Sequence, residues 1–324
     1  MTLRDLATEA GVSVSTVSKA FKNSPEISND TRERIFKIAR QQGCFHKYYQ
    51  EQYPNKVVAV ICPEIKSNHY SEQVEYLQNK LAGRGIEVLI ATDDFNATKQ
   101  QHIISLLAEH TKVDGIIVYE LRAPVPKGLE IPLVSIGTSE GIHHTDAIRG
   151  NQKKNFSTAI NHLRELGHRK IAFIGEPLTQ TSLEAFQQIM QNYELESDLV
   201  VTAEGRFEEA GKDGVRRLLE IGKPFTAIFC AYDYIAIGAI KELKKYGLQV
   251  PKDISVVGNN NIRTAGHLDK GLTTIDQSKE AFCDLACELL TKKIENPYYC
   301  SGTNIEISGS LIVRETTGPC NEKK

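Results

Sequence analysis

Residues 2–22 read TLRDLATEAGVSVSTVSKAFK, and this stretch decides how the N-terminal end of the chain folds. It predicts two short amphipathic helices that meet at the turn from Gly11 to Ser13. Thr2 and Ser13 are good N-caps, and Asp5 stands where it can complete a capping box with Thr2. Gly11 supplies the left-handed residue that ends the first helix, and the second helix then covers residues 14–21.

The two helices are expected to share a small apolar core, and the second helix presents a polar face. The core side chains are Leu3, Leu6, Ala7, Val12, Val17 and Phe21, and the outward residues are Val14, Ser15, Thr16, Ser18, Lys19 and Lys22. Serine and threonine are poor helix formers at this density, but they suit a helix that approaches phosphates and base edges. The pattern predicts a helix-turn-helix whose second helix enters a DNA major groove, with a plain helical hairpin as the alternative.

A third helix and a linker follow this motif. Ser28 is the expected N-cap of a helix over residues 29–42, and Gly43 ends it. Residues 1–43 therefore form an all-α headpiece. Residues 44–56 are polar and aromatic and are read as a hinge or linker.

The length of the chain indicates several domains, and its charge distribution indicates that only the N-terminal part contacts DNA. At 324 residues the chain is too long for one ordinary core. Residues 1–56 hold nine Lys/Arg and six Asp/Glu, a net charge of +3, whereas the remainder holds 30 and 35, a net charge of −5. A mildly basic head on an acidic body fits a DNA contact made by the N-terminus alone.

Cysteine usage and hydropathy indicate a soluble protein in a reducing compartment. The seven cysteines are odd in number and contain no Cys-x-x-Cys pair. No signal-peptide pattern and no run of roughly 18 apolar residues occurs, so we expect a cytoplasmic location and no membrane contact. His143 and His144 stand in a polar loop, and we expect neither a metal site nor a cofactor.

From Val57 the pattern changes to apolar runs that alternate with helices. Val57 to Cys62 is apolar throughout, as in a strand buried on both faces. Two consecutive series predict two lobes, each a doubly wound parallel sheet, with a ligand between the carboxyl ends of their strands. The first series has strands at 57–62, 86–91, 115–119 and 133–136 with helices at 71–83 and 99–110; the second has strands at 170–175, 199–202, 227–231 and 255–258 with helices at 156–166, 182–192, 208–221 and 234–246.

A helix at 279–293 and a strand at 305–313 remain without a series of their own. We expect them to cross back, one to each lobe, and so tie the lobes together. The expected limits are 57–148 with 277–300 for the first subdomain, 149–276 with 301–317 for the second, and 318–324 for a tail.

Several motifs, in this order and spacing, resemble those of the lactose-repressor/galactose-repressor (LacI/GalR) family of bacterial transcription regulators. The resemblance covers nearly the whole chain. Its motifs are LRDLA and AGVSVSTVSK within residues 3–19, ELGHRKI at 165–171, AIGA at 236–239, GLQVPKDISVVG at 247–258, LTTI at 272–275 and LIVRETT at 311–317.

The resemblance implies a homodimer, a headpiece that binds a palindromic DNA operator, and a type I periplasmic-binding-protein-like core that holds a small effector. Carried over by position, Val14, Ser15 and Lys19 would face base edges, and Ser13, Thr16 and Lys22 the DNA backbone. Ser18 belongs to the same DNA-facing set. Lys19 is the best candidate for a guanine contact, although lysine pairs less rigidly than the arginine that is commoner there.

The linker departs from the family pattern Gly-Tyr-x-Pro-Asn-x-x-Ala-Arg-x-Leu. In that pattern the segment forms a hinge helix whose leucine wedges into the minor groove. Here His46 replaces the proline, Glu51 the arginine and Tyr53 the leucine. Tyr53 could still wedge between base pairs, and a plain linker is the alternative.

The cleft departs from the pattern as well. Ser182 replaces an arginine, Asn260 an aspartate and Tyr232 an amide, and Asn151-Gln152 replaces Asp-Asn. These changes predict a cleft without fixed charges, which favours a neutral carbohydrate; a non-sugar effector, or none, is the alternative. The candidate effector-binding residues are Tyr70, Gly137, Ser182, Tyr232, Asp233 and Asn260, each of which could instead be structural.

The sequence thus predicts a DNA-binding regulator, and specifically a repressor of a carbohydrate-related operon. An exported solute receptor would share the core but needs an export signal. An enzyme would need a nucleophile and a base at a strand end, and no such set occurs. A regulator controlled by a protein or a non-sugar effector is the remaining alternative. A dimer is expected rather than a tetramer, because the tail has no heptad repeat.

Overall fold

The computed structural model describes residues 2–22, 24–48, 55–111, 113–126, 128–137, 145–296, 299 and 302–321. The chain divides into two compact units. The first is Met1–Lys56, with the short segment Gly85–Glu87, and the second holds the remainder.

The first unit contains four helices in its described part: α1 (Leu3–Ala10), α2 (Val14–Phe21), α3 (Asn29–Gln41) and α4 (Phe45–Tyr48). The expected caps are confirmed. Thr2 and Asp5 form a capping box, Gly11 ends α1 with a φ of 64°, and the Ser13 side chain accepts a hydrogen bond from the Thr16 N–H. These caps fix the turn between α1 and α2, because they satisfy backbone groups that the helix ends leave unpaired.

The headpiece continues beyond residue 43, where the sequence led us to expect a linker. Cys44 and Phe45 are buried in the same apolar cluster as the residues of α1 to α3. The Phe45 ring packs edge-on against Phe36 at 5.1 Å between centroids, and Phe21 lies 5.7 Å from Tyr48. Aromatic side chains bury a large apolar area, so their burial stabilises the packing of this segment against the headpiece core. Glu51 and Tyr53 lie outside the described residues.

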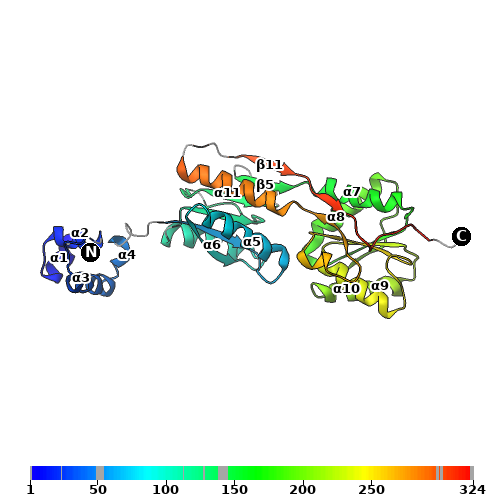
Figure 1. Cartoon of the computed structure of the whole chain (residues 1–324), viewed down its shortest axis with the longest axis horizontal. Coiled ribbons are helices and arrows are strands. Elements are labelled where there is room, and N and C mark those ends of the chain that lie inside the picture. Colours follow the sequence, from blue (N-terminus) through cyan, green and yellow to red (C-terminus); the bar gives the residue numbers. More distant parts are fainter. Residues whose placement is uncertain are drawn as a thin grey trace. The chain divides into compact units, whose positions relative to one another are not determined.

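The second unit holds two six-stranded sheets, one in each lobe (Figure 1). Parallel pairing joins β11 through β1 in the first sheet and β10 through β7 in the second, whereas β12 pairs with β10 antiparallel. The first sheet has the order β11 (Asn304–Ile307), β5 (Asp146–Gly150), β4 (Leu133–Ile136), β3 (Gly115–Tyr119), β1 (Lys56–Cys62), β2 (Ile86–Thr92); the second has β12 (Ser310–Ile312), β10 (Thr273–Asp276), β9 (Ser255–Asn259), β8 (Ala227–Cys230), β6 (Ile171–Gly175), β7 (Val200–Thr202).

The central strands are apolar because helices cover them. Every residue of β3 and β6 is buried, as parallel sheets with helical layers require. In the second lobe Phe173 lies opposite Phe229 on the neighbouring strand, with their rings stacked. The helices of the first lobe are α5 (Asn68–Ala82), α6 (Ala97–His110) and α11 (Lys279–Glu295); those of the second are α7 (Gln152–Glu165), α8 (Gln180–Asn192), α9 (Glu208–Ile221) and α10 (Asp233–Lys245), with 3₁₀ turns at Pro177–Thr179 (η2) and Arg263–Gly266 (η3).

The late segments differ from the expectation in one respect. The helix at 279–293 does return to the first lobe, as α11. The single strand expected at 305–313 is two strands, because Ser308 and Gly309 interrupt it. β11 joins the first sheet and β12 the second, so this segment crosses between the lobes instead of belonging wholly to the second. β5 was not predicted from the sequence.

The C-terminal segment is tied into the second lobe as far as residue 320. The Thr316 hydroxyl donates to the Val256 carbonyl at 2.8 Å, and the Cys320 N–H donates to the Leu166 carbonyl at 2.8 Å. His168 places one ring nitrogen 3.0 Å from the Gly318 carbonyl and the other 2.9 Å from the Thr226 hydroxyl. The motif around His168 therefore has a structural role, and residues 318–320 are more than a free tail.

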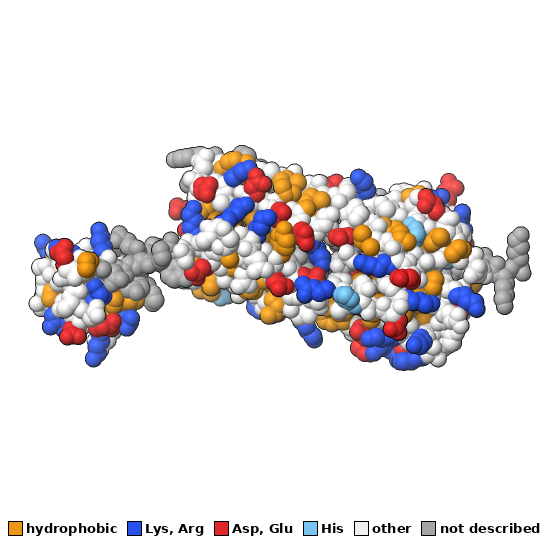
Figure 2. Space-filling model, in the orientation of Figure 1, with side chains coloured by type: hydrophobic (Ala, Val, Ile, Leu, Met, Phe, Trp, Pro, Cys, Tyr) orange, Lys and Arg blue, Asp and Glu red, His pale blue; other side chains and the backbone are white. Residues whose placement is uncertain are grey.

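Charge is well mixed over the visible face of the core. Figure 2 shows basic and acidic side chains interspersed there. This face carries no large field of one sign, which agrees with a DNA contact confined to the headpiece.

Candidate DNA interface and effector pocket

The outer face of α2 is built as the sequence predicts. Val17, Ala20 and Phe21 are buried in the headpiece core, which turns the opposite side of the helix outward. Val14 is 42% exposed, and Ser13, Ser15 and Lys22 are also exposed. Thr16, Ser18 and Lys19 are half-buried at the edges of this face.

Two polar contacts hold side chains of this face in place. The Ser13 and Thr16 hydroxyls lie 2.8 Å apart, so both are held at the N-terminus of the helix. The Lys19 ammonium lies 2.5 Å from the Glu26 carboxylate in the turn before α3. This ion pair could not be predicted from the local sequence pattern, because its members lie seven positions apart with a turn between them.

A pocket of about 540 Å³ lies between the two lobes of the core. Its lining comes from the carboxyl ends of strands in both sheets, where a doubly wound fold is expected to bind a ligand. All six residues predicted for the effector line it: Tyr70, Gly137, Ser182, Tyr232, Asp233 and Asn260.

Each lobe presents a tyrosine whose hydroxyl donates to a glutamate: Tyr70 is buried and Tyr232 is half-buried. The Tyr70 hydroxyl lies 2.5 Å from Glu120, and the Tyr232 hydroxyl lies 2.6 Å from Glu176. Burial, reinforced by the neighbouring carboxylate, raises the pKa of both tyrosines far above the usual value. Both hydroxyls therefore stay protonated, and their rings remain available as apolar surfaces.

Asp233 lines the pocket, but both of its carboxylate oxygens accept hydrogen bonds from residues of the second lobe. One oxygen accepts from the Thr274 hydroxyl at 2.5 Å and the other from the Ile262 N–H at 2.8 Å. Burial raises the pKa of Asp233 to about 7, although these hydrogen bonds oppose the rise. A Cβ on Gly258 would stand 2.2 Å from the carboxylate, so that glycine makes room for it.

The other predicted residues are held by local contacts. Gln152 donates to the Ser182 hydroxyl at 3.0 Å, so the replacements at 152 and 182 pair with each other. Asn260 has a φ of 103°, a strained value for a residue with a side chain. Gly137 has a φ of 93° and lies against Glu120.

The expectation of a cleft without fixed charges is wrong. Among the residues that the structure describes, five acidic and four basic residues line the pocket: Glu64, Glu120, Glu176, Asp233 and Glu306, with Arg149, Lys153, Arg206 and Lys279. Replacement of the family's arginine by Ser182 does not discharge the cleft, because Arg206 supplies a guanidinium from the loop after β7. Its position in the loop that follows a strand of the second sheet is the signal that could have found it.

Arg206 joins the two lobes. Its two terminal nitrogens donate to the two oxygens of Glu64, after β1, at 2.8 and 3.0 Å, and its Nε lies 3.4 Å from Glu176. Burial alone lowers the pKa of Arg206, but the bonds to Glu64 outweigh it and raise the pKa, so the group is charged. The guanidinium also lies over the rings of Phe207, at 4.5 Å, and Phe95, at 5.0 Å.

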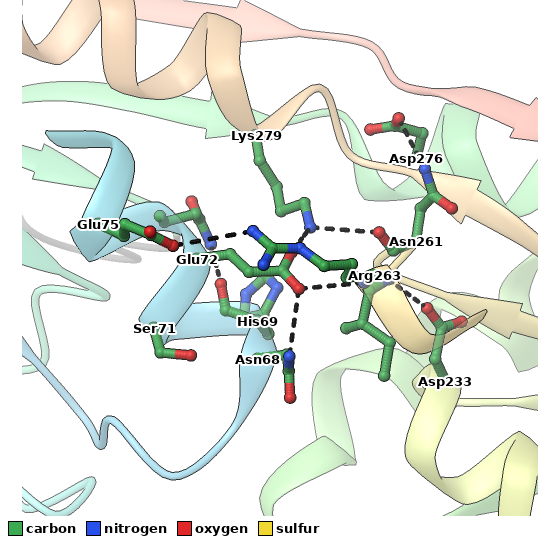
Figure 3. Close-up of polar contacts among 12 residues, drawn as sticks. Asn68, His69, Ser71, Glu72, Glu75, Asp233, Asn261, Arg263, Asp276 and Lys279 are labelled. Carbon is green, nitrogen blue, oxygen red and sulfur yellow. Dashed lines mark hydrogen bonds and ion pairs between the residues drawn. The ribbon is translucent and has the colours of Figure 1, made fainter. Parts of the chain in front are cut away.

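A second polar cluster joins the lobes at the start of α5 (Figure 3). Glu72 accepts from the Arg263 backbone N–H at 3.0 Å and from Lys279 Nζ at 2.5 Å. The Tyr234 hydroxyl bonds to Asn68 one turn earlier. His69 lies within this cluster, and burial lowers its pKa to about 4, so its ring is neutral at physiological pH.

Both parts of the chain match known families of protein domains. The family model for bacterial regulatory proteins of the lacI family matches residues 2–44, and that for the periplasmic binding protein-like domain matches residues 160–317. The repressor PurR of Edwardsiella ictaluri is 30% identical over 342 residues, covering 97% of this chain and 96% of PurR. The chain belongs to the lacI family.

A second relative agrees with this assignment. The repressor CytR of Escherichia coli K12 is 29% identical over 329 residues, covering 98% of this chain and 96% of CytR. As a lacI-family member the chain is a DNA-binding transcriptional regulator rather than an enzyme. The resemblance inferred from the motifs is confirmed.

Solved structures of lacI-type regulators share the fold. A complex of the regulator CelR with cellobiose aligns with a TM-score of 0.71 at 24% identity, over 98% of this chain and 99% of CelR. The lac repressor dimer bound to operator aligns with a TM-score of 0.72 at 21% identity, over 98% and 99%. The expected fold class, a helical headpiece and a two-lobed α/β core, is confirmed.

Two further observations concern the part of this lacI-family chain that the structure describes. No group of three or more metal-ligating side chains occurs there, and His143 and His144 lie outside it. Within the same residues, no helix has the length and apolar character to cross a lipid bilayer.

Proposed function

We propose that this protein represses a carbohydrate-related operon by binding a palindromic operator as a homodimer. In this proposal α2 lies in the major groove, with Val14, Ser15 and Lys19 at base edges. Ser13, Thr16 and Lys22 contact the DNA backbone, and Ser18 lies beside them.

The observation that carries the proposal is the exposed face of α2. It combines hydroxyls, one apolar side chain and two lysines, and α2 contains no acidic residue. The capped Ser13 places a helix N-terminus at the same edge, where unpaired N–H groups favour phosphate. Such a face suits both backbone positioning and base readout.

The proposed effector is a small neutral carbohydrate that binds between the lobes. The pocket volume lies within the usual range for small-molecule sites. Aromatic rings such as Tyr70 and Tyr232 suit the apolar faces of a sugar, and amides such as Asn260 and carboxylates such as Glu120 suit its hydroxyls. CelR holds cellobiose, and a regulator from Enterococcus faecium with this fold holds ribose.

Regulation would work through the relative rotation of the lobes. An effector that bridges them biases that rotation, and the dimer passes it to the spacing of the two headpieces. Two headpieces must match half-sites about one helical turn apart. The coupling is then the difference in effector affinity between the two arrangements.

A homodimer would have an apolar edge available. β2 stands at the edge of the first sheet, where Leu89 is 50% exposed and Ile90 47% exposed. Exposed apolar edges commonly pair with another chain.

The domain limits we propose are residues 1–48 for the headpiece, 57–150 with 277–307 for the first lobe, and 151–276 with 310–320 for the second.

Two experiments test the proposal. Selection of duplexes from a random library should enrich a palindrome, bound with two chains per duplex and more weakly as salt rises. A thermal-shift screen of mono- and disaccharides should find a ligand that stabilises the core by mass action. Failure to enrich any sequence would count against operator recognition, and stabilisation only by non-sugar compounds would count against a carbohydrate.

A further inference from the structure

Glu64 already fills the guanidinium fork of Arg206. The two terminal nitrogens reach the two Glu64 oxygens at 2.8 and 3.0 Å, which is the bidentate geometry in which arginine binds a carboxylate ligand. The third edge of the guanidinium, at Nε, faces Glu176. The arginine thus meets two carboxylates of its own chain inside the pocket.

The surroundings hold this pair in place. The Arg206 side chain is 34% exposed and that of Glu64 is 13% exposed. The rings of Phe207 and Phe95 lie against the guanidinium, and the Tyr232 hydroxyl donates to the same Glu176 oxygen that faces Arg206 Nε. A partly desolvated pair of this kind is worth more than an exposed one, since water screens it less.

A ligand that carries a carboxylate or a phosphate would have to displace Glu64 to use this arginine. Displacement would leave Glu64 without its cation beside the incoming anion and near Glu176, which faces the same arginine. Like charges at this spacing in a partly buried site repel, and an unpaired buried carboxylate is costly. A neutral polyhydroxyl ligand meets no such cost, because it can bind beside the intact pair.

We propose that Glu64 is a specificity-determining residue of the pocket: it occupies Arg206 as a built-in carboxylate and so excludes carboxylate- and phosphate-bearing effectors. This inference rests on the proposed function only in taking the pocket as the effector site. It also gives the unexpected Arg206–Glu64 pair a role in the pocket, because a paired arginine does not attract anions as a free one would.

The test removes the built-in carboxylate and asks whether anions can enter. Full-length wild type, Glu64→Gln and Glu64→Ala are titrated with inorganic phosphate and with D-glucuronate at constant ionic strength, and binding is followed by thermal shift and calorimetry. The control is Glu130→Gln, which makes the same charge change at an exposed residue of the first lobe outside the pocket lining.

Both Glu64 variants should bind at least one anion saturably, about tenfold or more tightly than wild type, whereas the control should behave as wild type. Adding Arg206→Gln to Glu64→Ala should abolish the gain. The proposal is overturned if wild type binds these anions through Arg206 equally well, or if neither Glu64 variant gains binding. Neither measurement needs the operator or the effector, so this test and the carbohydrate screen can fail separately. If both Glu64 variants fail to fold, anion binding by wild type that the single change Arg206→Gln abolishes still overturns the proposal.

Discussion

The ammonium of Lys19 on α2 lies 2.5 Å from the carboxylate of Glu26, in the turn before α3. Arg32 fixes that turn, because its Nη2 donates to the carbonyls of Ser24, at 2.8 Å, and Ile27, at 3.2 Å. The residue proposed to contact guanine therefore starts from an ion pair, which it has to give up when it meets DNA.

We predict that Glu26→Gln strengthens binding to non-specific DNA. Loss of the competing carboxylate frees Lys19 for phosphate, and exposed pairs of this kind are worth up to about 1 kcal/mol, so the affinity should rise about two- to fivefold. The dependence of log K on log salt should steepen by up to about one unit. Fluorescence anisotropy with a mixed-sequence duplex over a salt series measures both, with Glu33→Gln as the control because Glu33 is exposed on α3. Equal gains in the two variants would show that net charge alone is responsible.

Phe45→Ala should unfold the headpiece without unfolding the core. The Phe45 ring is 8% exposed and packs on Phe36 and Phe21, and such truncations cost about 3–5 kcal/mol. A domain of this size has little stability to spare. Hydrogen exchange of the full chain should lose protection in α1 to α3 and keep it in the core, whereas Tyr246→Ala, at a 55% exposed ring, should change neither. Retained protection in α1 to α3 would mean that residues 44–48 are a linker after all.

Gly238→Ala should destabilise the second lobe. A Cβ on Gly238, in α10, would stand 2.0 Å from the Glu208 carbonyl at the start of α9, and the reciprocal contact occurs between Gly211 and Ile235. Forcing the two helices apart should cost about 1–3 kcal/mol or more. Denaturant unfolding measures this cost. Gly83→Ala is the matched control, because its added Cβ meets only ordinary contacts at 3.6 Å; a loss of equal size there would refute the close-packing argument.

The stability of the core should depend on pH through Asp233. Burial raises its pKa to about 7 in the folded chain, whereas an unfolded aspartate titrates near 3.9. A raised pKa means that the folded state binds the proton more tightly, so the stabilisation is full below about pH 4 and is lost as the pH rises through about 7. The free energy of unfolding of wild type minus that of Asp233→Asn should therefore fall over this range and level off above it. A difference that grows with pH would mean that the hydrogen bonds from Thr274 and Ile262 prevail over burial.

Local signals in the sequence were enough to predict the headpiece and most of the core. The caps Thr2 and Ser13 and the left-handed Gly11 each act within a few residues, so they set the helix ends directly. Apolar runs such as those of β3 and β6 predicted the central strands because those strands are buried on both faces. β5 was missed because Asp146 and Arg149 interrupt its apolar pattern.

The errors came from contacts between residues far apart in the chain. The sequence places Phe45 in a stretch with the composition of a polar linker, but its ring packs against Phe21 and Phe36 in the headpiece core. The candidate effector residues, taken from the family resemblance, do line the pocket, yet the charge of the pocket was misjudged. Arg206 meets Glu64 across 142 positions, and no local pattern reports such a pair.

The central claim is that the outer face of α2 reads an operator. The most direct measurement is the affinity of Ser15→Ala/Lys19→Ala for the selected palindrome and for a mixed-sequence duplex, compared with wild type at the same salt. Two polar base contacts are lost, so the account predicts that operator affinity falls about 30-fold or more while non-specific affinity falls only a few-fold, which erodes specificity. Full retention of operator binding by the double variant, with its headpiece folded, would contradict the account.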